Sequence, residues 1–158
     1  QIGITIAGKG IPLDAFKLDH ACGAVEQVVL DQADKDILLI EGQGSLLHPG
    51  STATLPLMRG SCPTHLILCL RAEIKTLRSP EHIKIPDLND FIALNESLAS
   101  VFGTFPRSRV IGIAANTSML SEKDAIAYLS KTSKDTGLVT TDPIRYGIAP
   151  IGEQILMS

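Results

Sequence analysis

The distribution of apolar residues along the chain predicts alternating strands and helices. Short continuous apolar runs, typical of strands buried on both faces of a sheet, occupy residues 2–8, 36–41, 65–70 and 109–116. Apolar positions at three- and four-residue steps predict helices over residues 13–29, 88–102 and 121–137. A further short strand or extended segment and a turn are expected in residues 137–147. This alternation predicts an α/β fold with a mostly parallel sheet flanked by helices.

Local signals mark the ends of these helices. Pro12 suits the first turn of the first helix, and Gly103 ends the second. Ser121 is a typical N-cap for the third helix, acids follow it in the first turn, and Gly137 lies just past the last turn. Residues 71–87 are charged and contain proline, so we expect them to form a surface excursion.

The length and composition fit one α/β domain over residues 1–158. With 44% hydrophobic residues, the chain is long enough to close a single core. No apolar stretch approaches the roughly 18 residues of a spanning helix, and the first residues do not resemble a signal peptide. A net charge of -3 and 4% aromatic residues provide no basic or stacking surface for nucleic acid. We therefore expect a cytoplasmic protein that binds neither membrane nor nucleic acid.

The cysteines indicate a reducing compartment. Cys22, Cys62 and Cys69 are odd in number and have no C-x-x-C spacing, which argues against a disulfide framework or a zinc site. We expect reduced, partly buried thiols.

The stretch DILLIEGQGSLLHPGS, residues 36–51, contains the strongest candidate site. An apolar strand leads into an acid and then into a glycine-rich turn; these residues are Glu41, Gly42, Gln43, Gly44, Ser45 and His48. An acid at a strand end is where nucleoside triphosphatases hold magnesium or orient water, and glycines let the backbone approach a ligand. A tight turn with a capping acid is the simpler alternative.

Three separated segments, in order, resemble a known family. QIGITIAGKGIPLDAFKLDHACGAVE, IEGQGSLLHPGSTATLPLMRGSCPTHLILC and GLVTTDPIRYG are similar to the C-terminal domain of the DgcN-like family, long known as a domain of unknown function. The strand end in the second segment also resembles dethiobiotin synthetase and related P-loop proteins. The resemblance implies a P-loop NTPase-like fold joined to an N-terminal Rossmann-like domain. It also implies acetyl transfer from acetyl-CoA to D-glutamate or a similar amino acid.

The family's glycine-rich phosphate loop does not occur in this sequence. The chain has no G-x-x-x-x-G-K-[ST], and Lys9 is no substitute because its spacing and the residue after it are wrong. We therefore expect residues 1–158 to be the C-terminal part of a longer chain, with the phosphate loop upstream of Gln1. The expected partners are a small-molecule substrate, this upstream segment and a second copy in a homo-oligomer.

The resemblance also suggests catalytic and metal-binding residues. In dethiobiotin-synthetase-like sites an early aspartate joins the strand-end glutamate on magnesium, which points to Glu41 with Asp14 or Asp19. Helix-dipole acids or a solvated face explain these aspartates as well. Acetyl transfer requires a base for the attacking amine, and His48 or Glu41 is the candidate. The alternative for His48 is a loop histidine bonded to backbone.

Further candidates bind substrate or cofactor. Loop residues 42–45 are expected to contact the substrate, and Arg59 either clamps its carboxylate or faces water. Asn116 ends a strand where P-loop relatives read a nucleotide base, so it is a candidate for the adenine of acetyl-CoA. Asp142 and Arg145 lie in a stretch that resembles a second base-contacting segment, although a turn explains Asp142 equally well.

Three functions remain open at this point. The first is an N-acetyltransferase with acetyl-CoA as co-substrate. The second is a magnesium-dependent, ATP-using ligase or kinase-like enzyme on the same fold. The third is a nucleotide-binding module without turnover.

Overall fold

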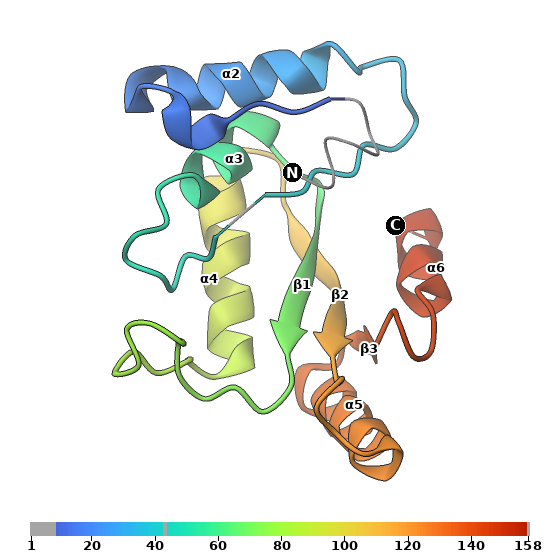
Figure 1. Cartoon of the computed structure of the whole chain (residues 1–158). Coiled ribbons are helices and arrows are strands. Elements are labelled where there is room, and N and C mark those ends of the chain that lie inside the picture. Colours follow the sequence, from blue (N-terminus) through green and yellow to red (C-terminus); the bar gives the residue numbers. More distant parts are fainter. Residues whose placement is uncertain (1–8, 43, 158) are drawn as a thin grey trace. The chain divides into compact units, whose positions relative to one another are not determined.

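The computed structural model describes residues 9–42 and 44–157 (Figure 1). Its internal contacts cluster into two compact units, Gln1–Pro63 and Thr64–Ser158, which are described separately. The strand expected over residues 2–8 and the side chain of Gln43 lie outside the described residues. A single α/β domain over the whole chain stays a prediction.

Two packed helices form the core of the first unit. A short 3-10 turn, η1 (Leu13–Ala15), precedes α2 (Leu18–Leu30), and α3 (Thr54–Ser61) follows later. Val25 of α2 is 4% exposed and Met58 of α3 is 9% exposed. A Cβ at Gly60 would lie 2.7 Å from the Cβ of Val25 and would also meet the carbonyl oxygen of Cys22. The missing side chain therefore lets α3 lie directly against α2, and the helix predicted over residues 13–29 is confirmed apart from its first turn.

The strand expected over residues 36–41 is wrong for this structure. These residues have no regular secondary structure, and their apolar side chains face solvent: Ile37 is 52% exposed, Leu39 81% and Ile40 43%. The apolar sequence favours a strand, but a strand forms only where its N–H and C=O groups pair with a neighbour. Among the described residues, no strand pairs with this segment.

The second unit contains a parallel sheet. Its described strands, β1 (His65–Arg71), β2 (Arg109–Asn116) and β3 (Val139–Thr141), lie in the order β1-β2-β3 and pair in parallel. The register between β1 and β2 shifts once, between Leu66 and Ile67. The central strand is the most buried, with Ile113 and Ala115 at 0% exposure. The predicted α/β fold is thus confirmed, and the strands predicted from 65 and from 109 are present.

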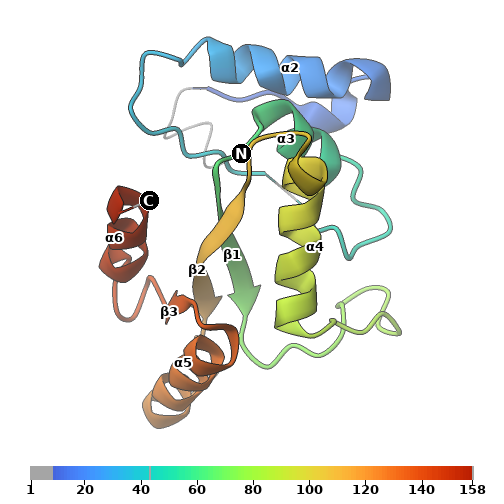
Figure 2. The same ribbon diagram turned by 180° about the vertical axis from the view of Figure 1, so that it is seen from behind.

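Helices cover this sheet on both sides. α4 (Leu88–Ser100) and α6 (Ala149–Met157) lie on opposite sides of the strands in Figures 1 and 2. Ile151 of α6 is fully buried because Gly112 has no side chain, and a Cβ there would lie 3.0 Å from the Ile151 side chain. The predicted end of α4 is confirmed, since a 3-10 turn, η2 (Val101–Gly103), closes it.

α5 (Glu122–Thr136) begins and ends where the sequence predicts. The Oγ of Ser121 accepts a hydrogen bond from the amide of Asp124 at 3.2 Å, which satisfies one of the free N–H groups of the first turn. Gly137 adopts the left-handed conformation that ends helices, with φ of 71°. The predicted N-cap and C-terminal glycine are therefore confirmed.

The remaining connections are mostly exposed. Residues 71–87 form the expected surface excursion, with one isolated antiparallel bridge between Thr76 and Lys84. Cys22, Cys62 and Cys69 are all exposed, so the expectation of partly buried thiols is wrong. Among the helices in residues 9–42 and 44–157, none has the length and apolar character needed to cross a membrane.

Candidate functional site

Hydrogen bonds fold the glycine-rich turn of the first unit onto the start of α3. The amide of Ser45 donates to Ser51 Oγ at 3.1 Å, and Ser51 Oγ lies 2.8 Å from Thr54 Oγ1. The amide of Leu47 donates back to Ser45 Oγ at 3.2 Å. The hydroxyls of this loop, residues 41–51, therefore stabilise its own fold. The predicted residues Glu41, Gly42, Gly44, Ser45 and His48 all lie in this loop, and a common site formed by their side chains stays a prediction.

The two glycines of the loop have a packing role. A Cβ on Gly42 would collide with the side chain of Leu57 in α3, and one on Gly44 would collide with Ser51 Oγ. Gly44 also has φ of +94°, a conformation that residues with a Cβ rarely adopt. The local fold thus requires a glycine at position 44, whereas at position 42 the end of the Leu57 side chain could move aside.

His48 is held by its own loop. Its Nδ1 accepts a hydrogen bond from the amide of Gly50 at 3.0 Å. Because an accepting nitrogen carries no proton, the proton of the neutral ring lies on Nε2. The basic lone pair is therefore already engaged, and the ring must leave Gly50 before it can accept a proton from a substrate. This geometry matches the alternative of a loop histidine bonded to backbone.

The predicted metal ligands lie on exposed parts of the first unit. Glu41 is exposed just after the apolar run, Asp14 lies in η1, and Asp19 in the first turn of α2. Within residues 9–42 and 44–157, no three His, Cys, Asp or Glu side chains lie close enough to hold a metal ion. Arg59 is half-buried in the last turn of α3. Magnesium binding and the substrate clamp stay predictions.

In the second unit, Asn116 lies at the carboxyl end of β2. Its Oδ1 accepts from the amide of Ser118 at 3.0 Å, and its carbonyl oxygen accepts from the amide of Ala72 at 3.0 Å. The second of these bonds joins the chain after β1 to the end of β2. The Asn116 side chain is exposed at the sheet edge where open α/β sheets bind ligands.

Asp142 fastens the end of β3 to the end of β2. Its Oδ2 accepts from the amide of Thr117 at 2.8 Å and from its hydroxyl at 2.5 Å. Its Oδ1 accepts from the amides of Ile144 at 2.9 Å and Arg145 at 3.2 Å. Burial alone would raise the pKa of this carboxyl, but the hydrogen bonds from Thr117, Arg145 and Ile144 outweigh it and lower the pKa to about 2. At 3% exposure, Asp142 orients the loop, and a direct contact with a cofactor stays a prediction.

Arg145 joins the same loop to the start of α5. It donates from one guanidinium nitrogen to the carbonyl oxygen of Leu120 at 2.7 Å and from the other to Glu122 at 3.2 Å. The hydroxyl of Tyr146 donates to Glu122 at 2.8 Å, and burial followed by this acid raises the pKa of the phenol. Hydrogen bonds therefore hold Asn116, Asp142 and Arg145 around one end of the sheet, and their contact with a cofactor stays a prediction.

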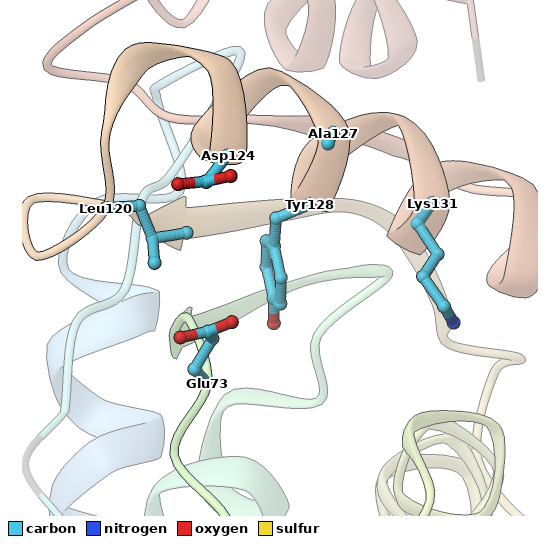
Figure 3. Close-up of a pocket in the computed structure, with 6 residues that line it drawn as sticks. All are labelled: Glu73, Leu120, Asp124, Ala127, Tyr128 and Lys131. Atoms are coloured by element: carbon cyan, nitrogen blue, oxygen red, sulfur yellow. The ribbon is translucent and has the colours of Figure 1, made fainter.

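A pocket that the sequence did not suggest opens beside α5, just beyond the ends of β1 and β2 (Figure 3). It has a volume of about 320 Å³ and is lined by Glu73, Leu120, Asp124, Ala127, Tyr128 and Lys131. The lining residues of α5 recur at three- and four-residue steps, a spacing that places them on one face. This spacing is visible in the sequence, but it does not by itself indicate a pocket, because polar residues along one face of a helix usually just face solvent.

Comparisons with known proteins agree with the fold and with the resemblance. A family model described as a domain of unknown function (DUF1611_C), P-loop domain, matches residues 1–152. A D-glutamate N-acetyltransferase from Tritonibacter scottomollicae is 36% identical over 148 residues, 93% of this chain and 44% of that protein. Another D-glutamate N-acetyltransferase, from a Pseudoalteromonas species, is 34% identical over 152 residues, 96% of this chain and 45% of that protein.

A solved structure is also similar. The crystal structure of a DUF1611 family protein from Anabaena variabilis matches with a TM-score of 0.94 and 46% identity, over 99% of this chain and 46% of that chain. The chain thus spans a little less than half the length of each of these relatives. Because the family model covers nearly all of it, the chain belongs to the DUF1611 family and represents that family's P-loop domain.

Proposed function

We propose that the complete protein transfers an acetyl group from acetyl-CoA to the amino group of D-glutamate or a similar amino acid. The observation that supports this most is the pair of D-glutamate N-acetyltransferases, which are 36% and 34% identical to the chain over nearly its whole length. The P-loop description of the family fits binding of the phosphate groups of coenzyme A. Because the chain spans less than half of those relatives, the activity is proposed for the complete protein.

The reaction requires one proton acceptor and one site for developing negative charge. The free amine attacks the thioester carbonyl, the C–N bond forms, and the C–S bond breaks with the thiolate of coenzyme A as leaving group. The amine must first lose the proton that makes it an ammonium, and a general base takes that proton. A second proton leaves the nitrogen when the C–S bond breaks, and it ends on the thiolate of coenzyme A. Loop 41–51 offers two such groups, the carboxylate of Glu41 and the imidazole of His48.

The hydrogen bonding of the loop favours Glu41 as the base. The basic nitrogen of His48 is occupied by the Gly50 amide, whereas Glu41 is exposed at the start of the loop. The pH–rate profiles of the two variants distinguish the groups, because each variant loses only the limb that arises from the group it removes. We expect Glu41→Gln to lower turnover by about 10²-fold or more, and His48→Ala to have a much smaller effect.

The test is a rate assay on the complete protein with acetyl-CoA and D-glutamate, from pH 5 to pH 9. Formation of N-acetyl-D-glutamate is followed by mass spectrometry, and circular dichroism checks that each variant is folded. If His48→Ala abolishes the pH-dependent limb while Glu41→Gln retains near-wild-type turnover, the assignment to Glu41 is wrong and His48 is the base.

An ATP-dependent reaction is the second candidate, and the P-loop description of the family favours it. In that case Glu41 would hold magnesium with Asp14 or Asp19 and would not act as a base. Incubation of the complete protein with ATP, magnesium and amino acids separates the two candidates. Release of ADP or AMP that depends on the amino acid, with no acetylated product from acetyl-CoA, would support the ATP-dependent reaction.

A further inference from the structure

The pocket beside α5 is built from side chains that two different strand ends position. Glu73 lies two residues after β1, and Leu120 lies between β2 and α5. The hydrogen bond from the Ala72 amide to the Asn116 carbonyl oxygen ties these two connections together at 3.0 Å. The pocket is therefore anchored to the rigid edge of the sheet, although its walls belong to loops and a helix.

Glu73 is held in an uncommon conformation at the mouth of this pocket. Its φ of 61° places it in the left-handed region, where residues other than glycine, asparagine and aspartate are rare. Such conformations cost free energy and are found at functional sites as well as at helix ends, where Cys62 and Val101 adopt them here. In Figure 3 the carboxylate of Glu73 lies opposite α5, near Leu120 and Tyr128. Within the described part of the chain, it forms no ion pair.

The polar groups of the pocket are arranged by charge. Asp124 is fixed at the start of α5, because its Oδ2 accepts from Ser121 Oγ at 2.6 Å and its amide donates to the same atom. Lys131 lies two turns later and forms an exposed ion pair with Asp135, whose hydrogen bond raises the pKa of the lysine. In Figure 3 the ring of Tyr128 lies between the two acids on one side and Lys131 on the other.

These features define the ligand by its chemistry. The acidic end suits an ammonium group, the basic end suits a carboxylate, and the ring of Tyr128 with Leu120 provides an apolar wall for a short carbon chain. Asp124 and Lys131 lie seven positions apart in α5, so they share one face of the helix about two turns from each other.

We propose that this pocket binds the amino acid that accepts the acetyl group, with its ammonium toward Glu73 and Asp124 and its distal carboxylate toward Lys131. The proposal rests on the proposed function for the identity of the acceptor. It gives the pocket the role that the resemblance suggested for residues 42–45 and Arg59, and it makes Glu73 rather than Glu41 the acid that faces the ammonium. The two assignments therefore compete and can be compared directly.

Calorimetric titration of the complete protein tests the pocket without turnover. The ligands are D-glutamate and glutarate, which has both carboxylates and lacks the ammonium. We expect Glu73→Gln to weaken D-glutamate binding by about tenfold or more and to leave glutarate binding unchanged. Lys131→Met should weaken both ligands. Glu153→Gln, an exposed acid of α6 outside the pocket lining, is the matched control and should change neither.

Two results would overturn the proposal. The first is wild-type affinity for D-glutamate in both Glu73→Gln and Lys131→Met. The second is loss of D-glutamate binding in Arg59→Met alone, which would place the amino acid at the other candidate. The proposed function fails independently of this proposal if the rate assay yields no acetylated product although the titration shows that D-glutamate binds.

Discussion

Replacing Asp142 by asparagine turns one of its two carboxylate oxygens into an NH₂ group. Asp142 is a buried acid of the second unit whose carboxylate is held by several hydrogen bonds. The carboxylate accepts four hydrogen bonds, two from Thr117 and two from the amides of Ile144 and Arg145. An asparagine accepts through one atom only, and its NH₂ group must face one of the two donor pairs. The Thr117 hydroxyl can rotate to accept, but at least one backbone N–H is left without an acceptor in a site that is 3% exposed.

The size of the effect follows from the pKa and from the hydrogen bonds. Folding lowers the pKa of Asp142 from 3.8 to about 2. At about 1.4 kcal/mol for each pKa unit, this corresponds to roughly 2 kcal/mol of stability. Hydrogen bonds to a charged group contribute about 1.5–3 kcal/mol each, so Asp142→Asn should lower the free energy of unfolding by about 2–4 kcal/mol. Because folding depresses the pKa, this stability is complete above pH 4 and is lost as the pH falls through about 2.

Urea unfolding followed by far-UV circular dichroism measures both predictions. At pH 7 the variant should unfold at clearly lower urea than the wild type, and the difference should shrink as the pH falls below 4. Asp135→Asn, which removes an acid from an exposed ion pair, is the control and should cost less than about 1 kcal/mol. A free energy of unfolding for Asp142→Asn within about 0.5 kcal/mol of the wild type at pH 7 would refute the reasoning, since so small a change is typical of a surface substitution.

Two further predictions concern local structure. Ser121→Ala should lower the free energy of unfolding by about 1 kcal/mol, because it removes the N-cap of α5 and the hydrogen bond to Asp124. The same urea method measures it. As a control, Ser130→Ala replaces an exposed residue within the same helix and should leave the free energy of unfolding nearly unchanged. Gly44→Ala should destabilise the first unit by more than roughly 1 kcal/mol, because the new Cβ would collide with Ser51 Oγ and because the positive φ of this residue disfavours a side chain. A thermal midpoint equal to that of the wild type would show that the loop rearranges freely.

The elements that the sequence predicts correctly have their determinants nearby in the chain. α5 has an N-cap at Ser121, acids in its first turn and Gly137 at its end, so all its signals lie within one segment. β1 and β2 are continuous apolar runs, which favour buried strands, and the two strands pair in parallel in the sheet. Local periodicity and capping residues therefore suffice to predict an element where its packing in the fold favours the same structure as its own sequence.

Two helices were missed because their sequences contain residues that usually interrupt helices. α3 contains Pro56 and Gly60, and α6 contains Pro150 and Gly152. Each proline lies in the first turn of its helix. Backbone N–H groups there have no acceptor within the helix, so the N–H that proline lacks costs no hydrogen bond. Gly60 is required for contact with α2, a reason that appears only in the packed structure.

The candidate site shows the same limit. The sequence predicts a turn after Glu41 and a strand end at Asn116, and the structure has both, although the described residues just before Glu41 form no strand. That either feature belongs to a functional site stays a prediction. The sequence did not reveal that the lone pair of His48 is taken by Gly50, that Asp142 is buried, or that Glu73 faces α5. Those properties depend on hydrogen bonds and on contacts between distant segments, which periodicity does not encode.

The exposed run at residues 36–41 also affects how the catalytic test must be done. Six residues rich in isoleucine and leucine, without proline, form the kind of segment through which separate copies stack into β aggregates. Asp36 and Glu41 are the first and last of these six residues, and like charges at both ends oppose such stacking. Glu41→Gln removes one of these two charges, so low turnover in that variant would also follow from precipitation. Asp36→Asn removes the other charge without changing the candidate base, and comparing the solubility of the two variants separates colloidal loss from chemical loss.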